Sequence, residues 1–421
     1  MACHEVPLPG NGQGRPRHTV GEVFRAHAEA YRAQHALTEV QRKVLRDVAA
    51  CRTPVLGGHV DVCVDCGREW PVYYSCRNRH CPTCQALSQA RWIEGRKARL
   101  LPVDYFHVVF TVPDDEINGL ALRNRELFFD ALFAAGSQTL LALGRDDKRL
   151  GAQLGLTAVL HTWTRDLRFH PHLHCIVTAG GLSWDGTQWK ATRQGYLFPV
   201  RVLADLFRGK LLAILDDAFR EGRLRLDGVA GFGGGVSDDV AWRRLKRKLY
   251  RTKWVTYAKQ PFAGAEAVYS YLGCYTHRVG LSDRRIIDVT DDAVTFRTRG
   301  DDTATMHPVE FVRRFLLHAL PRGFVKLRHY GLLAPGNVNT KLAAARRLLE
   351  EPNSAPAPTA SAAPDESRAD RATSDEVSTG WRAVLLRLTG VDVTRCRVCG
   401  GELLSRALAR APPRAAGGDT S

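Results

Sequence analysis

The stretch RFHPHLHCIV, residues 168–177, places three histidines at alternating positions and then continues as an apolar, strand-like run. Side chains alternate between the two faces of a β-strand, so His172 and His174 share one face while Leu173 and Cys175 share the other. Two neutral imidazoles side by side on a rigid sheet suit a divalent metal ion. The same pair also fits an ordinary polar strand face in contact with solvent or a carboxylate, so the rest of the chain must decide.

The segments around this stretch predict a mixed fold. Residues 105–113 and the run LGLTAVLHTW are typical of strands, and residues 125–143 have helical spacing. Further helices are expected at about 200–220 and 238–258, and the alternation at 286–300 is typical of a hairpin. Mixed order and short connections predict an α+β domain with a central, mostly antiparallel sheet flanked by helices.

Composition divides the chain into segments. Residues 346–380 are rich in Ala, Pro and Ser and cannot bury enough apolar surface to fold. We therefore predict that they form a flexible, disordered linker. The expected segments are an N-terminal helical segment (1–50), a cysteine-rich domain (51–100), a larger α+β domain (101–345), the linker (346–380) and a C-terminal tail (381–421).

The charge balance indicates a polyanionic partner. The chain has 60 Lys and Arg against 44 Asp and Glu, a net charge of +16, for which nucleic acid is the first candidate and a merely soluble basic protein the alternative. No stretch approaches the roughly 18 uninterrupted apolar residues of a membrane helix, and the first residues lack the apolar core of a secretory signal. We therefore expect no membrane association, and a cytoplasmic protein whose cysteines bind metal rather than form disulfides.

The segment CVDCGREWPVYYSCRNRHCPTC contains two CxxC pairs with the spacing of a four-cysteine structural zinc site. These pairs are Cys63 with Cys66, and Cys81 with Cys84. Four unrelated buried cysteines are the alternative. We predict one structural Zn²⁺ on these four thiolates.

Other potential ligands lie near that segment and in the tail. A second tetrahedral zinc site, or a set of groups that only surround the first, is predicted from Cys51, His59, Cys76 and His80. The tail stretch CRVCGGE adds Cys396 and Cys399, which look like half of a zinc ribbon with no obvious second half. A redox pair or a degenerate knuckle explains them equally well.

A basic, aromatic stretch and a group of tyrosines complete the candidates. The run WRRLKRKLYRTKW combines cations that can follow a phosphate backbone with aromatic faces that can stack on unpaired bases. A solvated helix face is the alternative. The candidate DNA-binding residues are Trp242, Arg243, Arg244, Lys246, Arg247, Lys248, Arg251, Lys253 and Trp254.

Tyr271 and Tyr275 are four residues apart, so on a helix they face the same way. Two hydroxyls presented together could attack phosphate in turn. A core-facing stripe that also includes Tyr269 is the alternative reading of this stretch.

Together these residues resemble the IS91-like transposases, two-tyrosine members of the HUH (His-hydrophobic-His) endonuclease superfamily. The resemblance extends to about residue 340. It rests on CRTPVLGGHVDVCVDCG, YYSCRNRHCPTCQ, FHVVFTVP, HPHLHCIV, YLGCYTHRVGLSDRRI and LPRGFVKLRHYGLL. One position departs from the pattern, because Cys274 stands where an arginine is expected.

The resemblance implies that residues 101–345 form an HUH catalytic core with a ferredoxin- or RRM-like sheet, preceded by a small zinc-binding, DNA-binding domain. It implies that His172 and His174 hold a catalytic Mg²⁺ or Mn²⁺. Such an ion needs a third ligand, which we expect from proximity to be His170 or His161. Tyr271 and Tyr275 are then the nucleophiles.

The implied activity is transposition of a rolling-circle-type insertion sequence, by metal-dependent nicking of single-stranded DNA and strand transfer through a 5′-phosphotyrosine. Single-stranded element ends and target DNA are the expected partners, with host replication factors as further candidates, at the bacterial nucleoid. The alternatives are a rolling-circle replication initiator or relaxase-like nickase, and a non-catalytic zinc-dependent DNA-binding protein. The zinc segment argues against the first, and the intact histidines and tyrosines argue against the second.

Overall fold

The computed structural model describes residues 16–85, 99–233, 235–262, 280–350, 382, 386 and 391–408. The chain forms two compact units. We call Met1–Trp92, His277–Ala319 and Ala362–Ser421 the cysteine unit, and Ile93–Thr276 with Leu320–Ser361 the histidine unit.

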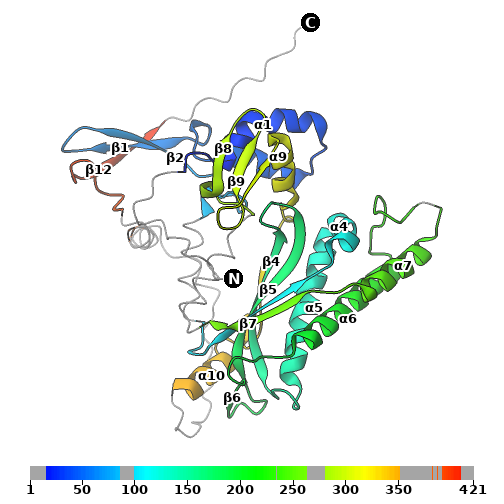
Figure 1. Cartoon of the computed structure of the whole chain (residues 1–421). Helices are drawn as coiled ribbons and strands as arrows, with labels where there is room; N and C mark the ends of the chain where they lie inside the picture. Colours follow the sequence, from blue (N-terminus) through cyan, green and yellow to red (C-terminus); the bar gives the residue numbers. More distant parts are fainter. Residues whose placement is uncertain are drawn as a thin grey trace. The chain divides into compact units, whose positions relative to one another are not determined.

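The described part of the histidine unit is built on a six-stranded sheet in which neighbouring strands are antiparallel. Five strands lie in the order β11-β4-β5-β3-β7, and β6 pairs with the end of β5 (Figure 1). The strands are β3 (Tyr105–Thr111), β4 (Gln153–Trp163), β5 (Phe169–Leu182), β6 (Trp189–Ala191), β7 (Thr256–Phe262) and β11 (Leu327–Gly331). The α+β class with an antiparallel sheet, expected from the sequence, is confirmed.

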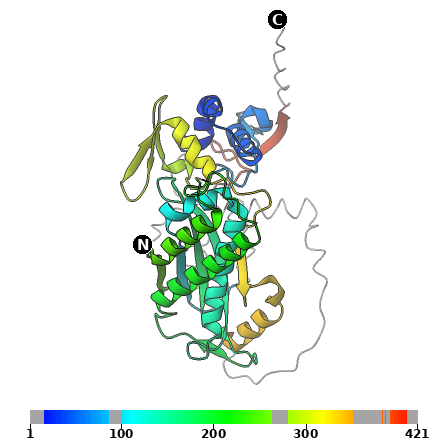
Figure 2. The same cartoon turned by 90° about the vertical axis from the view of Figure 1, so that its right-hand side faces the viewer.

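Helices cover one face of this sheet, as Figure 2 shows. A Cβ atom at Gly136 would lie 2.6 Å from Leu173 Cδ2, so glycine lets its helix approach the sheet closely. The rings of Phe110 and Phe207 stack with centroids 4.6 Å apart on the same side. Because Leu173 points to the helices, His172 and His174 point to the opposite face. The helices on this face are α4 (Asp114–Arg123), α5 (Arg125–Arg145) and α6 (Val200–Arg220), and α7 (Asp238–Arg251) contacts α4.

One described helix, α5, is long and apolar enough to cross a membrane by length and composition alone. In the structure, 67% of its most apolar window is buried within the protein. It packs against α6 and strand β4. Its apolar character therefore matches a helix of the hydrophobic core.

Helix α10 (Lys341–Glu350) contacts β6 and β5, the strand with which β6 pairs. Leu101, Leu182, Leu332 and Leu342 form a buried cluster there. The predicted linker therefore begins later than residue 346, and residues 351–380 lie outside the described ones.

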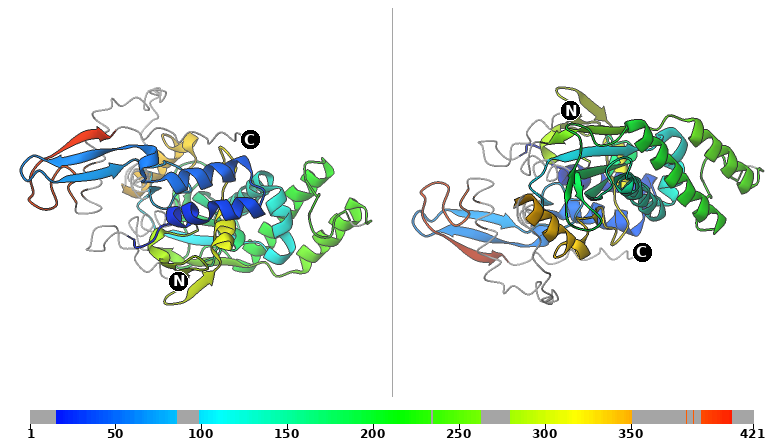
Figure 3. Two further views of the ribbon diagram at one scale, coloured as in Figure 1. Left: turned by 90° about the horizontal axis from the view of Figure 1, so that it is seen from above. Right: turned by 90° about the horizontal axis from the view of Figure 1, so that it is seen from below.

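The cysteine unit contains two N-terminal helices that lie side by side (Figure 3) and a small helix-and-sheet layer. Both N-terminal helices begin with a capping box, in which Thr19 pairs with Glu22 and Thr38 with Gln41. The elements are α1 (Val20–Gln34), α2 (Glu39–Ala50), β8 (Ile286–Val289), β9 (Val294–Arg297), β10 (Thr303–Met306) and α9 (Pro308–Leu317).

Residues 277–319, expected from the sequence in the domain 101–345, belong to the cysteine unit. Phe24 of α1 meets Phe315 of α9 edge to face, with ring centroids 5.2 Å apart. The carboxylate of Asp283 accepts hydrogen bonds from the Val20 N–H at 2.9 Å and the Thr83 hydroxyl at 2.7 Å. These contacts attach the segment to α1 and to the cysteine-rich region.

A three-stranded antiparallel ribbon completes the cysteine unit, and it joins both ends of the chain. Its order is β12-β1-β2, so the tail strand pairs with the N-terminal hairpin (Figures 1 and 3). The strands are β1 (Gly58–Cys63), β2 (Glu69–Tyr73) and β12 (Leu403–Leu408). Short 3₁₀ turns lie at η1 (Pro54–Leu56), η2 (Asp283–Arg285) and η3 (Pro335–Asn337).

One helix is shorter than the sequence predicted. The helix expected over 238–258 ends at Arg251, and the chain becomes extended at Thr252. The β-branched residues Val255 and Thr256 then lead into β7, which pairs with β3. Pairing with the sheet thus overrides the helical pattern at this end.

Candidate metal centres and nucleic-acid interface

Three histidines meet on the face of the sheet that α5 and α6 leave uncovered. His161 lies on β4, directly opposite His172 on the neighbouring β5. His174 is two residues further along β5, on the same face. One ring nitrogen from each histidine lies within 4.8 Å of the other two. His161 and His174 are buried, and His172 is partly buried.

A backbone carbonyl fixes the tautomer of His172, and a third imidazole contacts the ring of His174. The Nδ1 atom of His172 lies 2.7 Å from the carbonyl oxygen of His170, so Nδ1–H donates and Nε2 keeps its lone pair. The Nδ1 atom of His174 lies 2.8 Å from Nε2 of His107, on β3. When His174 donates in that bond, its Nε2 is also left as a lone pair, which is the state of a metal-binding imidazole.

Burial keeps these imidazoles uncharged. Burial, with His170 nearby, lowers the pKa of His172 to about 3. Burial, with Lys259 nearby, lowers the pKa of His107 to about 3. The pKa of His174 is well below its ordinary value because of burial and then because of the neighbouring His161. His172 and His174 therefore offer neutral nitrogen ligands at physiological pH.

His170, considered from the sequence as a third ligand, lies outside this group. Its Nδ1 is 2.5 Å from the carboxylate of Asp114, at the start of α4. His161, the other candidate from the sequence, completes the group instead. The reason is register, because His161 lies opposite His172 on the next strand. His107 was missed from the sequence, although its alternating position in FHVVF places it on the same face.

The three nitrogens fit a divalent cation with open positions. Atoms bound about 2.1 Å from one ion lie within about 4.2 Å of each other, so the observed spacing needs only a small closure of the rings. Imidazole nitrogen is a better ligand for Mn²⁺ than for Mg²⁺, which prefers oxygen. Mn²⁺ is therefore the better match of the two expected ions.

The predicted nucleophiles, Tyr271 and Tyr275, lie outside the described residues, as do Tyr269 and Cys274. The chain enters their segment from β7, which pairs with β3 and ends at Phe262.

Eight of the cysteines in the described part of the chain form two groups of four, and the grouping differs from the predicted one. The pair Cys63 and Cys66 does not lie with Cys81 and Cys84. The first group is Cys51, Cys76, Cys81 and Cys84, and the second is Cys63, Cys66, Cys396 and Cys399.

The hairpin β1–β2 explains this correction. Cys51 precedes β1 and Cys76 follows β2, so both lie at the open end of the hairpin. Cys63 and Cys66 lie at its turn, at the far end of a six-residue strand. Such a strand is about 20 Å long, so one ion cannot reach both ends.

The first cysteine group is tied to the helices around it. The Sγ atoms of Cys76 and Cys84 are 3.8 Å apart, close to the roughly 3.8 Å expected for two thiolates on one tetrahedral zinc ion. The Asn78 N–H donates to Cys76 Sγ at 3.4 Å, and the Asn78 side chain donates to Asp47 of α2. Hydrogen bonds among the thiols lower the pKa of Cys51, so a thiolate is already favoured here. These residues fit a structural zinc ion.

The two histidines expected near the cysteines belong to neither group. His59 Nε2 is 3.3 Å from a carboxylate oxygen of Asp61. His80 Nδ1 is 3.1 Å from Asn78 Oδ1. Sequence proximity suggested them as ligands, but the structure completes each group with cysteines alone.

The basic helix α7 buries Trp242 and exposes most of its cations together with Tyr250. Trp242 stacks on Phe219 and donates to Asp216 at 2.7 Å, and Trp254 donates to the Leu249 carbonyl at 2.8 Å. Both rings are buried, so they pack the core and are not faces for base stacking, which corrects the sequence-based expectation.

The cationic side of α7 remains a candidate surface for phosphate. Lys246 pairs with Asp216 at 2.8 Å and Lys248 with Glu116 at 3.6 Å. Arg243, Arg247 and Arg251 recur every fourth residue, so they form one exposed stripe. Arg244 and Lys253 are exposed beside it.

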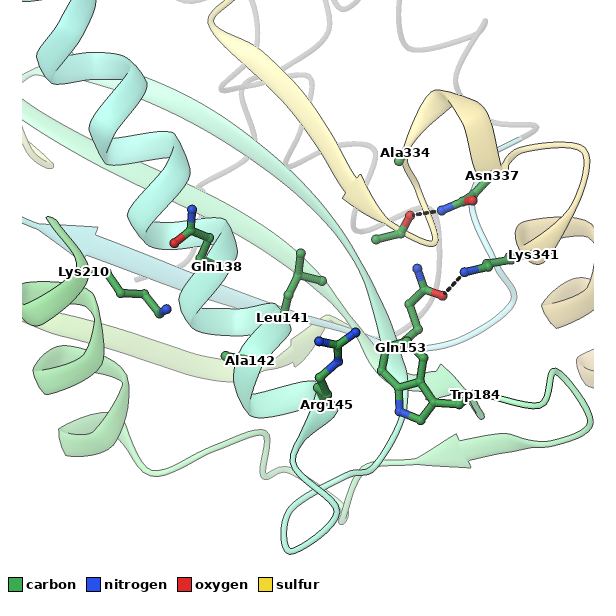
Figure 4. Close-up of a pocket in the computed structure, with 11 residues that line it drawn as sticks. Gln138, Leu141, Ala142, Arg145, Gln153, Trp184, Lys210, Ala334, Asn337 and Lys341 are labelled. Carbon is green, nitrogen blue, oxygen red and sulfur yellow. Dashed lines mark hydrogen bonds between the residues drawn. The ribbon is translucent and has the colours of Figure 1, made fainter. Parts of the chain in front are cut away.

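A pocket of about 660 Å³ lies elsewhere in the histidine unit, as Figure 4 shows. Arg145, Lys210 and Lys341 line it, and the Arg145 guanidinium lies 4.9 Å from the ring centre of Trp184. Gln153 marks its position at the opposite end of β4 from His161. The pocket is therefore separate from the histidine group.

Comparisons with known proteins match two separate ranges of the chain. A family model described as "Transposase zinc-binding domain" matches residues 23–112, and one described as "Putative transposase" matches residues 155–341. The first range contains the whole first cysteine group but only half of the second. The second range contains His161, His172 and His174.

Two relatives are similar over most of the chain. The "Putative transposase y4qJ" of Sinorhizobium fredii is 44% identical over 387 residues, covering 90% of this chain and 92% of the relative. The "Transposase for insertion sequence element IS801" of Pseudomonas savastanoi pv. phaseolicola is 27% identical over 313 residues, covering 71% of each. No solved structure gives a significant match.

Proposed function

The chain belongs to the IS91-like family of insertion-sequence transposases, so DNA is its partner, and from this premise we propose that the histidine unit is an HUH-type nuclease. It nicks one DNA strand with a tyrosine and transfers the covalently held end to a target. The observation that carries the proposal is the meeting of His161, His172 and His174 on one sheet face, where burial lowers the pKa of His172 and His174.

The histidines would hold a divalent Mn²⁺ or Mg²⁺ at the scissile phosphate. Such an ion polarises the phosphoryl oxygens and neutralises charge that develops during the reaction. His107 orients His174, and the His170 carbonyl orients His172, so the ligands are positioned before DNA binds. The chain therefore contributes imidazole ligands that are already oriented, and the two on β5, His172 and His174, are uncharged.

The nucleophile in this proposal is Tyr271 or Tyr275, assigned by the family resemblance. A tyrosine hydroxyl has a pKa near ~10 and is a weak nucleophile at neutral pH without help. Its oxygen forms a bond to phosphorus while the bond from phosphorus to the 3′ oxygen breaks. The tyrosine proton goes to solvent and the 3′ oxygen takes one up, which leaves a 5′-phosphotyrosine and a free 3′-OH.

The covalent product keeps the phosphodiester in a reactive form. A 3′-OH on a target strand can attack the phosphotyrosine and release the tyrosine, so joining needs no ATP. Because the two tyrosines are four residues apart, a helix would present both hydroxyls on one side. The second hydroxyl can then cut another strand while the first holds its DNA end.

The exposed stripe Arg243, Arg247 and Arg251 is the proposed track for the DNA backbone. Guanidinium groups bind phosphate oxygens in a sequence-independent way and supply most non-specific affinity. Trp242 and Trp254 support this helix from its buried side.

Replacing both His172 and His174 by Ala tests the proposed function. Nicking of a single-stranded element-end oligonucleotide with Mn²⁺ should be abolished, while the affinity for that oligonucleotide stays within about threefold because phosphate contacts dominate it. An unchanged zinc content and circular dichroism spectrum would show that the variant is folded. Nicking at the wild-type rate by a folded double variant would refute the proposal.

A further inference from the structure

Two stretches at opposite ends of the chain share one pattern, CVDCG at 63–67 and CRVCG at 396–400. Their glycines, Gly67 and Gly400, have φ of 69° and 76°, a conformation that glycine adopts without strain. Each glycine N–H donates to the carbonyl of the first cysteine in its stretch, at 3.0 and 2.9 Å. The two stretches are thus the same turn, made twice.

The cysteines of the two turns face one another. Cys63 and Cys399 have Sγ atoms 3.4 Å apart, and Cys66 and Cys396 have Sγ atoms 3.8 Å apart. These distances are close to the roughly 3.8 Å between thiolates on one tetrahedral zinc ion, and far from the ~2.05 Å of a disulfide. Backbone N–H groups also point at Sγ of Cys63 and Cys396, at 3.5 and 3.4 Å, which favours thiolates.

We propose that these four cysteines bind a second structural zinc ion, which closes a ribbon built from both ends of the chain. The residues matched by the zinc-binding family model end at 112, so half of this site lies outside that match. Cys63 and Cys66 of the N-terminal hairpin are thus the second half of the zinc ribbon whose first half is Cys396 and Cys399.

The ribbon needs such an ion because it has almost no apolar core. Val60 is buried, but Val64, Val398 and Leu404 are more than half exposed. Three strands without an apolar face are marginal in water, and small domains of this kind depend on bound metal. The ion, more than packing, therefore holds β12 against β1.

The two turns also fit each other closely at one point. A Cβ atom at Gly401 would lie 2.2 Å from Asp65 Oδ2, so a larger residue at this position would have to displace the Asp65 side chain. Pairing continues from there along the whole of β1, from Cys63 opposite Leu403 to Gly58 opposite Leu408. The tail is therefore an integral strand of the ribbon.

Counting zinc in the full chain after pairwise removal of cysteines tests the proposal. Wild-type protein purified without chelator should carry two equivalents. The double variants Cys63→Ser/Cys66→Ser and Cys396→Ser/Cys399→Ser should each carry one. The quadruple variant should also carry one, because both pairs serve the same ion.

Other outcomes overturn the proposal. If the quadruple variant carries none, the two pairs bind different ions. If the tail double variant keeps two equivalents, the tail cysteines bind no zinc. Val398→Ser is the matched control, because this exposed residue lies between the two tail cysteines and should leave two equivalents bound.

A second measurement does not depend on how well the variants fold. A protease site placed between residues 351 and 380 of otherwise wild-type protein allows the tail to be cut free. The cut tail should stay bound to the rest of the chain and be released by a zinc chelator. Release without chelator, or retention after all zinc is removed, contradicts the proposal.

Discussion

The two candidate third ligands, His161 and His170, differ in what surrounds their rings. One ring nitrogen of His161 lies within 4.8 Å of ring nitrogens of His172 and His174. The Nδ1 atom of His170 instead lies 2.5 Å from a carboxylate oxygen of Asp114. We expect His161→Ala to weaken Mn²⁺ binding by more than about 100-fold, beyond the 10- to 100-fold effect of groups that only orient a ligand. The matched variant His170→Ala should change Mn²⁺ binding by less than about 10-fold, because it keeps the backbone carbonyl that orients His172, and titration calorimetry can measure both effects. Equal losses would contradict the assignment of His161.

His107 predicts how stability depends on pH. Its folded pKa of about 3 lies below the ordinary value of 6.5, so below pH 6.5 the unfolded chain binds a proton that the folded chain does not. Wild-type stability from this group is fully present above pH 6.5 and is reduced by about 2 kcal/mol at pH 5.

The variant His107→Gln lacks this proton uptake. The difference in unfolding free energy between wild type and variant, measured by urea denaturation without added cation, should therefore shrink from pH 8 to pH 5. Zinc loss at low pH affects both proteins alike and cancels in the difference. A difference that stays constant over this range would show that His107 is not a buried neutral group.

Residue-level chemistry was predictable where it depended on local alternation. The face shared by His172 and His174 follows from a period of two, and it holds in the structure. The partners of that pair did not follow, because His161 and His107 reach it through the register of other strands. Register depends on the whole sheet, which a single stretch of sequence does not specify.

At the scale of elements, α7 carries the clearest prediction. Replacing Arg243, Arg247 and Arg251 by Ala should weaken binding of single-stranded DNA of any sequence and reduce the salt slope of the affinity by roughly two to three. Removing three exposed arginines elsewhere in the histidine unit, Arg149, Arg193 and Arg223, is the control with the same change in net charge. Fluorescence titrations over a range of salt concentrations provide both quantities. Identical slopes for the two triple variants would exclude a specific role for α7.

For the same stretch, the sequence pattern did not predict which side chains are buried. The interleaved aromatic and basic residues suggested one mixed surface, but Trp242 and Trp254 point inward and the arginines outward. Helical periodicity separates them, since Trp242 lies on the side of Leu249, seven residues on. The hairpin β1–β2 similarly separates cysteines that are near in sequence, which spacing alone could not show.

At the scale of the whole molecule, the class of the fold was predictable and the division of the chain was not. Antiparallel strands and flanking helices follow from local patterns. The placement of residues 277–319 and of the tail in the cysteine unit depends on contacts between distant segments, such as Phe24 with Phe315. Such contacts are made by apolar residues that have no distinctive local signature.

Mapping a covalent DNA adduct tests the central claim most directly. Full-length protein is incubated with a single-stranded element-end oligonucleotide and Mn²⁺, and the trapped adduct is digested and sequenced by mass spectrometry. We predict DNA attached through a 5′ phosphate to Tyr271 or Tyr275, an adduct with each single Phe variant, and none with Tyr271→Phe/Tyr275→Phe. Tyr269→Phe, which removes a neighbouring hydroxyl, should form the adduct normally. An adduct at Tyr269 or another residue, or one that persists in the double variant, would contradict the mechanism.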